Sequence, residues 1–524
     1  MISIPTMRDP TDDIVATETA DSRHQSEVQR RVLSVPPAAE FKRRSVRGGT
    51  AAVLGQAFSI ALQIGTTVVL ARLLSPADYG LQAMVITLTG FFSLFKDAGL
   101  SVATVQRETL THEQISTLFW INLGLGTFLT IAVAATGPFL VAFYKEPRLL
   151  WLTIASSSIF LFNSLSVQHK ALLDRSMRFG TGVKIDILTA TIGSVVAVGM
   201  AALGCGYWSL ICQNITLPIV GTAATWIAMP WLPGRPRWTT ELRSMARFGG
   251  TVTLNSFVVY VAYNTEKILL GRFWGAAPLG IYSRAYQLAN LPVQQLISSV
   301  HGVAFSALSR IQGEAQRLQR AYLKSQTIIV SLTIPVIIAC AFFAREIVLA
   351  MLGQKWIAAA PVLRFLAPTI LIFALVNPFS WLLQATGRVQ RSLNIAFLIC
   401  PVVILGILAG LRHGPSGVAL GYSAAMLLLF VPIVAWATHG TGITAASYWD
   451  SVKRPLIAGM IGGGMAWLLS FLFGAALAPI PLLAVELTTS FVVYVVCLFL
   501  VMGQKEFYVD LVRNVMGRRQ GATA

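Results

Sequence analysis

The chain has 524 residues, of which 55% are apolar and 12% charged, and its mean hydropathy is +0.68. This composition excludes a single soluble core and predicts a polytopic membrane protein. Nearly charge-free stretches of about 20 residues recur, and each is long enough to cross a bilayer as a helix. Strands of about ten residues with alternating polarity are absent from the sequence, which excludes an outer-membrane barrel.

The net charge of +18 follows the expected membrane topology. About 30 of the 40 lysines and arginines fall in the tails and the even-numbered loops, so the positive-inside rule places both termini in the cytoplasm. No RNA-recognition or helix-turn-helix pattern accompanies the charge, and nucleic-acid binding is not expected. The five cysteines and six histidines show no metal-binding spacing, so no metal or other cofactor is predicted.

The predicted fold class is all-α, with about fourteen transmembrane helices arranged as two six-helix lobes and a final pair. The helices are expected over 50–71, 81–95, 115–136, 149–167, 184–203 and a stretch ending near 229; then 250–270, 280–301, 325–343, 362–383, 393–411 and 417–437; and finally 455–473 and 482–502. The domains are a disordered tail (1–43), the lobes (44–230 and 243–440), the extra pair (453–503) and a cytoplasmic tail (504–524). Aromatic residues near helix ends are predicted to anchor the membrane interface: Trp226, Trp231, Trp274 and Tyr282.

Two related stretches indicate that the lobes arose by duplication. Arg72-Leu-Leu-Ser-Pro-Ala-Asp-Tyr-Gly80 and Arg272-Phe-Trp-Gly-Ala-Ala-Pro-Leu-Gly280 share arginine, alanine and glycine at an offset of two hundred positions. Solenoid repeats are only about 20 to 50 residues long, whereas transporters are commonly built from two halves. Both stretches follow an outward-running segment, so residues 47–229 and 247–437 are expected to superpose about an axis along the membrane normal.

The seventh and eighth segments carry the densest polar content inside the predicted membrane. Tyr260, Asn264 and Lys267 are spaced to form one stripe of a helix, and Glu266 lies beside it. The eighth segment adds Arg284 together with Ser283, Gln287, Asn290, Gln294, Gln295 and Ser298. Charges at membrane depth normally face a hydrated cavity or a partner. In the alternative interpretation, the cations extend to the interface or neutralise Glu266.

Three more charged positions lie near predicted helix ends. Lys96 and Asp97 follow the second segment, where an ordinary cytoplasmic loop is the alternative interpretation. Arg72 lies between the first two segments and could equally be a loop arginine that pairs with Asp78.

Several motifs resemble the Wzx-like bacterial polysaccharide flippases of the multidrug/oligosaccharidyl-lipid/polysaccharide exporter superfamily. They are 71–81, 97–101, 113–117, Ala171-Leu-Leu-Asp-Arg-Ser-Met-Arg-Phe179, Gly206-Tyr-Trp-Ser-Leu210, Glu266-Lys-Ile-Leu-Leu-Gly-Arg272, Leu279-Gly-Ile-Tyr-Ser283 and Pro292. The resemblance covers residues 44–440 and implies two six-helix lobes in a V, with the first, second, seventh and eighth helices lining a cavity. The family commonly has aspartate where this chain has Glu266.

The resemblance implies a flippase, not an enzyme, that moves undecaprenyl-pyrophosphate-linked oligosaccharide across the bacterial inner membrane for exopolysaccharide or O-antigen assembly. The expected substrate-binding residues are Lys267, Arg284, Arg272, Lys96, Arg72, Asn264, Gln287 and Asn290. Glu266 and Asp97 are expected to carry the coupling ion, H⁺ or Na⁺. Expected partners are the lipid-linked oligosaccharide, membrane lipids, a polymerase and glycosyltransferases.

Two other functions stay open at this stage. A multidrug exporter of the same superfamily would have a more apolar cavity. A polysaccharide polymerase or ligase generally has one large periplasmic loop, whereas every predicted outer loop here is short. If the flippase interpretation is right, Lys267→Ala and Arg284→Ala are predicted to abolish export and leave membrane insertion intact.

Overall fold

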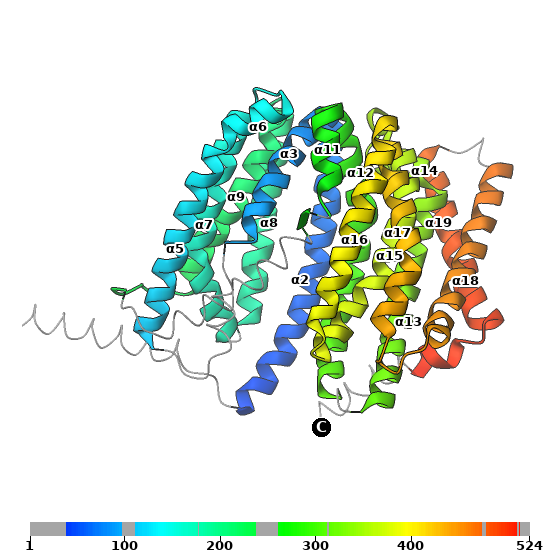
Figure 1. Ribbon diagram of the computed structural model, residues 1–524. Helices are drawn as coiled ribbons and strands as arrows, with labels where there is room; N and C mark the ends of the chain where they lie inside the picture. The colour runs from blue at the N-terminus through cyan, green and yellow to red at the C-terminus, as the bar shows by residue number, and fades with distance from the viewer. Residues whose placement is uncertain are drawn as a thin grey trace, which may run out of the picture. The chain divides into compact units, whose positions relative to one another are not determined.

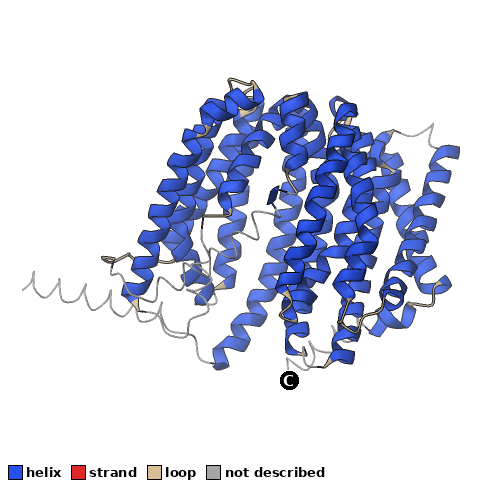
Figure 2. Ribbon diagram, viewed as in Figure 1, coloured by secondary structure: helices blue, strands red, loops and turns tan. Residues whose placement is uncertain are grey.

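The computed structural model describes residues 38–96, 111–176, 178–236, 260–261, 263–311, 314–473, 478–510 and 513. Within these ranges every regular element is a helix and no strand occurs, as Figure 2 shows. The predicted all-α class is confirmed.

Helices occupy part or all of every predicted segment (Figure 1). The N-terminal part contains α2 (Ala38–Leu73), α3 (Pro76–Ser93), α5 (His112–Ala135), α6 (Gly137–Tyr144), α7 (Leu149–Arg175), α8 (Phe179–Ala202) and α9 (Trp208–Ala228). The C-terminal part contains α11 (Thr265–Trp274), α12 (Ala276–Arg310), α13 (Ala315–Phe342), α14 (Ala344–Met351), α15 (Ala359–Ala385), α16 (Val389–Gly410), α17 (Gly414–Thr438), α18 (Ala445–Phe473) and α19 (Pro479–Val496). Three shorter pieces are η1 (Gln354–Trp356), η2 (Leu411–His413) and η4 (Cys497–Val501).

Ten helical stretches among the described residues are long and apolar enough to cross a membrane, so the chain is a multi-pass membrane protein. One of them, Gln390–Thr438, contains both α16 and α17, whereas α3, α11 and α12 are not among the ten. Helix α12 contains the polar side chains predicted for the eighth segment, and α11 has only ten residues. The total of fourteen spans therefore stays a prediction.

The predicted continuous helix over 250–270 is wrong at its C-terminal end. Helix α11 begins at Thr265, and Asn264 has a non-helical backbone with φ −131° and ψ 0°. Tyr260 and Val261 are helical, Asn264 lies in a turn, and Lys267 lies in the first turn of α11, so a break separates Tyr260 from Lys267 and the three do not form one regular helical stripe. Residues 250–259 lie outside the described part of the chain.

The chain divides into two compact units. Unit 1 consists of Met1–Thr66, Leu88–Ala142 and Glu146–Ser256, and unit 2 of Thr67–Thr87, Phe143–Lys145 and Phe257–Ala524. In unit 1, α5 packs on α7, and α9 packs on both α7 and α8. The first turns of α3 belong to unit 2 although they come early in the sequence.

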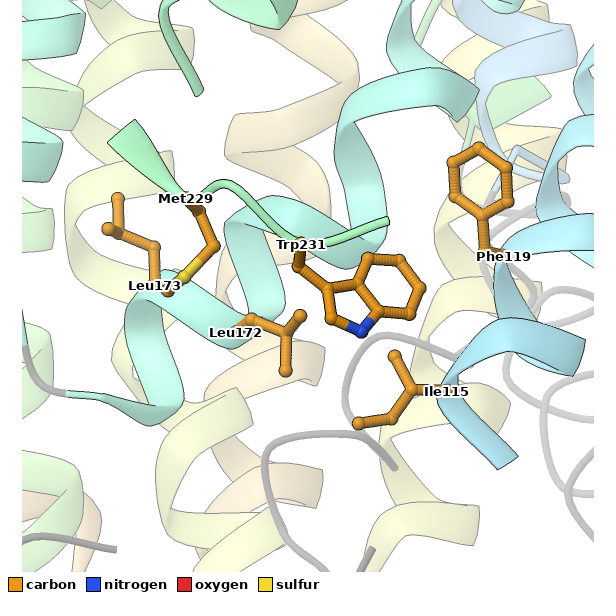
Figure 3. Close-up of a cluster of buried hydrophobic side chains, with 6 residues drawn as sticks. All are labelled: Ile115, Phe119, Leu172, Leu173, Met229 and Trp231. Atoms are coloured by element: carbon orange, nitrogen blue, oxygen red, sulfur yellow. The ribbon is translucent and has the colours of Figure 1, made fainter. Parts of the chain in front are cut away.

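Trp231 fills the centre of a hydrophobic cluster in unit 1. Figure 3 shows its indole close to Ile115 and Phe119 of α5 and Leu172 of α7. The side chain is only 2% exposed, and its Nε1 donates to His112 Nδ1 at 3.1 Å. The prediction of an interface anchor is therefore wrong for Trp231, because the chain after α9 folds back and buries the indole in protein.

Trp231→Ala is expected to destabilise the protein by about 3–5 kcal/mol, because it leaves a large cavity and removes the donor to His112 Nδ1. Thermal unfolding of the purified protein measures the loss. Leu232→Ala is the matched control, since Leu232 is the next residue along the chain and its side chain is 65% exposed. Equal midpoints for the two variants would contradict a core role for Trp231.

In unit 2, α15 packs against α12, α13 and α17, while α16 packs on α17 and α18 on α13. A Cβ atom on Gly410 would lie 2.0 Å from the Gly417 carbonyl oxygen, so only glycine permits this approach of α16 and α17. Helices α18 and α19 are held by tyrosines: the Tyr448 hydroxyl donates to the Leu375 carbonyl at 2.8 Å, and the Tyr494 hydroxyl donates to the Ser331 carbonyl at 2.9 Å. These bonds fix the final helix pair to the rest of unit 2.

Candidate functional site

Glu266 is a fully buried acid in the first turn of α11. Its side chain has 0% exposure, and neither carboxylate oxygen accepts a hydrogen bond from a described residue. The cation that pairs with it among the described residues is Lys267, whose Nζ lies 3.9 Å from Oε1. A carboxylate in the first turn is favoured by the helix dipole, yet burial of an ion inside a protein is expensive unless it is paired. Burial of Glu266 therefore costs free energy, which is typical of a residue retained for function.

Lys267 is shared between several partners. Its Nζ donates to Asn264 Oδ1 at 2.8 Å and lies 5.4 Å from the centroid of the Tyr286 ring. About a fifth of the lysine side chain is exposed (22%), so the ammonium connects the buried carboxylate to a more accessible region. Asn264, Glu266 and Lys267, which the sequence singled out, lie together in the structure.

Arg284 lies in a second group, on α12. The guanidinium carbon is 4.0 Å from the centroid of the Tyr79 ring, and Nη2 donates a long hydrogen bond of 3.4 Å to Gln82 Oε1. Its Nε is buried without a hydrogen-bond partner among the described residues. No carboxylate of the described residues forms an ion pair with Arg284. The cation is thus held by a ring and an amide and keeps its positive charge uncompensated.

Two glycines explain how Tyr79 reaches Arg284. A Cβ atom on Gly80 would lie 1.7 Å from the Ala276 carbonyl oxygen, and one on Gly280 would lie 1.8 Å from the Pro76 carbonyl oxygen. Both distances are far below van der Waals contact, so the first turns of α3 and α12 touch through their backbones. The contact is reciprocal, since each glycine meets the residue four positions before the other.

The other predicted site residues are more dispersed. Arg272 is partly buried with its guanidinium carbon 5.8 Å from the Phe143 ring. Arg72 is exposed, and its Nη2 donates to the Ala350 carbonyl at 3.4 Å. It does not pair with Asp78, whose Oδ2 instead accepts from the Ser75 backbone N–H at 2.9 Å, while the Ser75 hydroxyl accepts from the Asp78 backbone N–H at 3.4 Å. These two bonds form a reciprocal cap at the start of α3.

Gln287 and Asn290 are partly buried on α12, and Asn290 Oδ1 accepts from Gln294 Nε2 at 3.5 Å. Lys96 is exposed just after α3 and belongs to unit 1, whereas the groups around Glu266 and Arg284 belong to unit 2. Asp97 lies outside the described residues. In the described ranges no three His, Cys, Asp or Glu side chains are grouped to hold a metal ion.

Sequence reasoning missed Tyr79, Gln82 and Trp356. Trp356 is fully buried, packs edge-on against Tyr79 with centroids 5.2 Å apart, and donates Nε1 to the Ala71 carbonyl at 2.8 Å. Tyr282, predicted to anchor the interface, is also fully buried, and its hydroxyl has no described hydrogen-bond partner. The repeated stretches contained the signal for Tyr79, because it precedes the shared glycine; no pattern pointed to Trp356.

Ten apolar helical stretches, together with a buried acid and an arginine that has no carboxylate partner among the described residues, are typical of a polytopic helical membrane protein with a polar site. A family model described as polysaccharide biosynthesis protein matches residues 69–361, more than half of the chain. The chain belongs to this family.

The curated relatives include the teichuronic acid biosynthesis protein TuaB of Bacillus subtilis, 26% identical over 70% of this chain and 77% of the relative. The lipopolysaccharide biosynthesis protein WzxC of Escherichia coli is 25% identical over 73% of this chain and 78% of its own. The succinoglycan biosynthesis transport protein ExoT of Rhizobium meliloti is 24% identical over 64% and 68%. The predicted resemblance to Wzx-like flippases and the prediction of a transporter, not an enzyme, are confirmed.

Solved structures show the same fold. The lipid II flippase MurJ in an inward closed conformation aligns with a TM-score of 0.69 and 15% identity, over 88% of this chain and 99% of its own. An inward-facing multidrug resistance MATE family transporter of the MOP superfamily aligns with a TM-score of 0.58 and 15% identity, over 73% and 94%. At this identity the comparison establishes the fold alone.

Proposed function

We propose that the protein moves an undecaprenyl-pyrophosphate-linked oligosaccharide repeat unit from the cytoplasmic to the periplasmic leaflet of the bacterial inner membrane, for exopolysaccharide or O-antigen assembly. A glycan and a diphosphate cannot cross hydrocarbon unaided, so fixed protein groups must replace their water. The family and the relatives named for polysaccharide biosynthesis support this substrate class. A polymerase and glycosyltransferases are the proposed partners, and both termini are proposed to be cytoplasmic.

One observation carries the proposal: Arg284 lies within a helix bundle of a membrane protein with no acidic partner among the described residues. A cation that only neutralised a protein charge would lie against a carboxylate. Arg284 instead rests on an aromatic ring, with donors suited to a phosphate. An exporter of apolar drugs does not need such a cation, whereas a flippase for a lipid diphosphate does.

The buried Glu266 supports coupling to an ion gradient. Among the described residues, its carboxylate accepts no hydrogen bond and has one cation nearby, at 3.9 Å, so it is able to take up H⁺ or Na⁺. Because Lys267 contacts both this acid and the more accessible Asn264, ion binding at Glu266 would release the ammonium towards substrate. We propose alternating access coupled in this way.

The proposal is tested in a deletion strain carrying the gene on a plasmid. Arg284→Ala is expected to reduce polymer about 10- to 100-fold, the loss of one or two charge-assisted hydrogen bonds, and to accumulate lipid-linked repeat units on the cytoplasmic face. Arg317→Ala is the control, because Arg317 is 66% exposed and pairs with Glu314. Immunoblotting checks protein level.

Two outcomes would contradict the proposal. Full polymer production by Arg284→Ala would remove this residue from the site. Normal polymer in the deletion strain, together with increased sensitivity to drugs, would identify a multidrug exporter instead.

A further inference from the structure

The guanidinium of Arg284 lies over an aromatic ring. Its carbon is 4.0 Å from the centroid of the Tyr79 ring, which is a short cation–π distance. The N–H donors of a guanidinium lie in the plane of the group and form a fork that meets two phosphate oxygens at once. One of these donors, Nε, has no hydrogen-bond partner among the described residues, and Nη2 has only a long bond to Gln82.

Tyr79 is itself held firmly. It is 1% exposed, and Trp356 packs edge-on against it at an interplanar angle of 74°. The indole is anchored in turn by its hydrogen bond to the Ala71 carbonyl at the end of α2. Ala71, Tyr79, Arg284 and Trp356 therefore form one continuous array in unit 2, drawn from α2, α3, α12 and η1.

The glycine contact sets the spacing of this array. Tyr79 directly precedes Gly80, and Arg284 follows Gly280 by about one helical turn. Because the backbones of α3 and α12 touch at these glycines, the ring and the guanidinium are held at their short separation by the packing of the two helices.

We propose that Tyr79, supported by Trp356, is a positioning residue that presents the N–H edge of Arg284 to the phosphates of a lipid diphosphate. The inference rests on the proposed function and adds to it a residue that does not touch the substrate. It predicts selectivity for a group with two adjacent anionic oxygens, so a diphosphate binds more tightly than a monophosphate, and an uncharged prenol does not bind at Arg284.

The test measures binding of farnesyl diphosphate, farnesyl monophosphate and farnesol to the purified full-length protein in nanodiscs. Tyr79→Phe keeps the ring and is expected to bind the diphosphate as the native protein does. Tyr79→Leu and Arg284→Lys are each expected to weaken diphosphate binding about tenfold or more, and Tyr79→Leu to add little in the Arg284→Lys background. Tyr322→Leu is the control, because Tyr322 is equally buried but stacks on Phe379.

A second measurement does not depend on a stable Tyr79→Leu protein. Phenylalanine carrying one, two and three fluorine atoms at position 79 keeps the ring's shape and progressively weakens its attraction for a cation. Diphosphate affinity is expected to fall stepwise along this series. Constant affinity would overturn the positioning role alone. Absence of diphosphate binding by the native protein would overturn the proposed function, and the positioning role with it.

Discussion

Gly80→Ala and Gly280→Ala are each expected to abolish export. At both positions the new methyl group would lie within 1.8 Å of a carbonyl oxygen of the facing helix, and backbone atoms cannot rotate away as a side chain does. The first turns of α3 and α12 must then separate. Overpacking of this kind typically costs about 1–3 kcal/mol and shifts the backbone, so Tyr79 and Arg284 would lose their stacking distance.

The matched control for the glycine variants is Gly302→Ala. Gly302 lies in the same helix as Gly280, and no described atom of a neighbouring element lies within 4 Å of the position of an added Cβ atom. Polymer production and thermal unfolding of all three variants are measured side by side. If Gly80→Ala and Gly280→Ala support as much polymer as Gly302→Ala, then the close contact of α3 and α12 is not required for export.

These glycines also show what the sequence was able to predict. The similarity between residues 72–80 and residues 272–280 is visible in the sequence, and it drew attention to both stretches. The sequence contained no indication that the two copies touch each other, because a contact between residues two hundred positions apart depends on how helices pack. The superposition of the two halves stays a prediction, although a reciprocal contact is what a two-fold relation produces.

The helices themselves were predictable from hydropathy, because a bilayer requires long apolar segments with internally bonded backbones. Their ends were less so. Helix α11 begins only at Thr265, and the sequence offered no proline or glycine to mark that boundary. Trp231 was misplaced for a related reason: a tryptophan after an apolar segment is equally suited to the interface or to a core, and only the fold decides.

The charged residues of the candidate site stand out because charge is rare in this chain, whereas the aromatic partner of Arg284 does not. Arg284 and Glu266 lie in apolar surroundings, and a cation that neutralises Glu266 was the alternative interpretation of this stretch. Tyr79 and Trp356 did not, since buried aromatic residues are common in any membrane protein and their contacts come from distant segments. The residues that surround a buried charged side chain are therefore harder to predict from sequence than the charged residue itself.

The structure changes the expectation for Lys267. From sequence, Lys267→Ala was predicted to leave membrane insertion intact, but its ammonium is the only described cation within 4.0 Å of the fully buried Glu266. Lys267→Met is therefore expected to destabilise the protein by about 3 kcal/mol, the low end for breaking a buried pair, because the lysine is partly exposed and its pairing distance is long. Both the midpoint temperature of thermal unfolding and the level of inserted protein are expected to fall.

Glu266→Gln removes the charge that Lys267→Met leaves unpaired, so the double variant is expected to recover most of the lost stability. A coupling energy of about 2–3 kcal/mol in this double-mutant cycle would identify the two residues as an ion pair in the membrane. Transport is then measured with and without an ion gradient in the well-inserted Glu266→Gln and double variants. Strictly additive stability losses would contradict the pair. Recovered stability together with export that no longer responds to the gradient is the expected result, because the neutral amide that replaces the carboxylate fills the same space and binds neither H⁺ nor Na⁺.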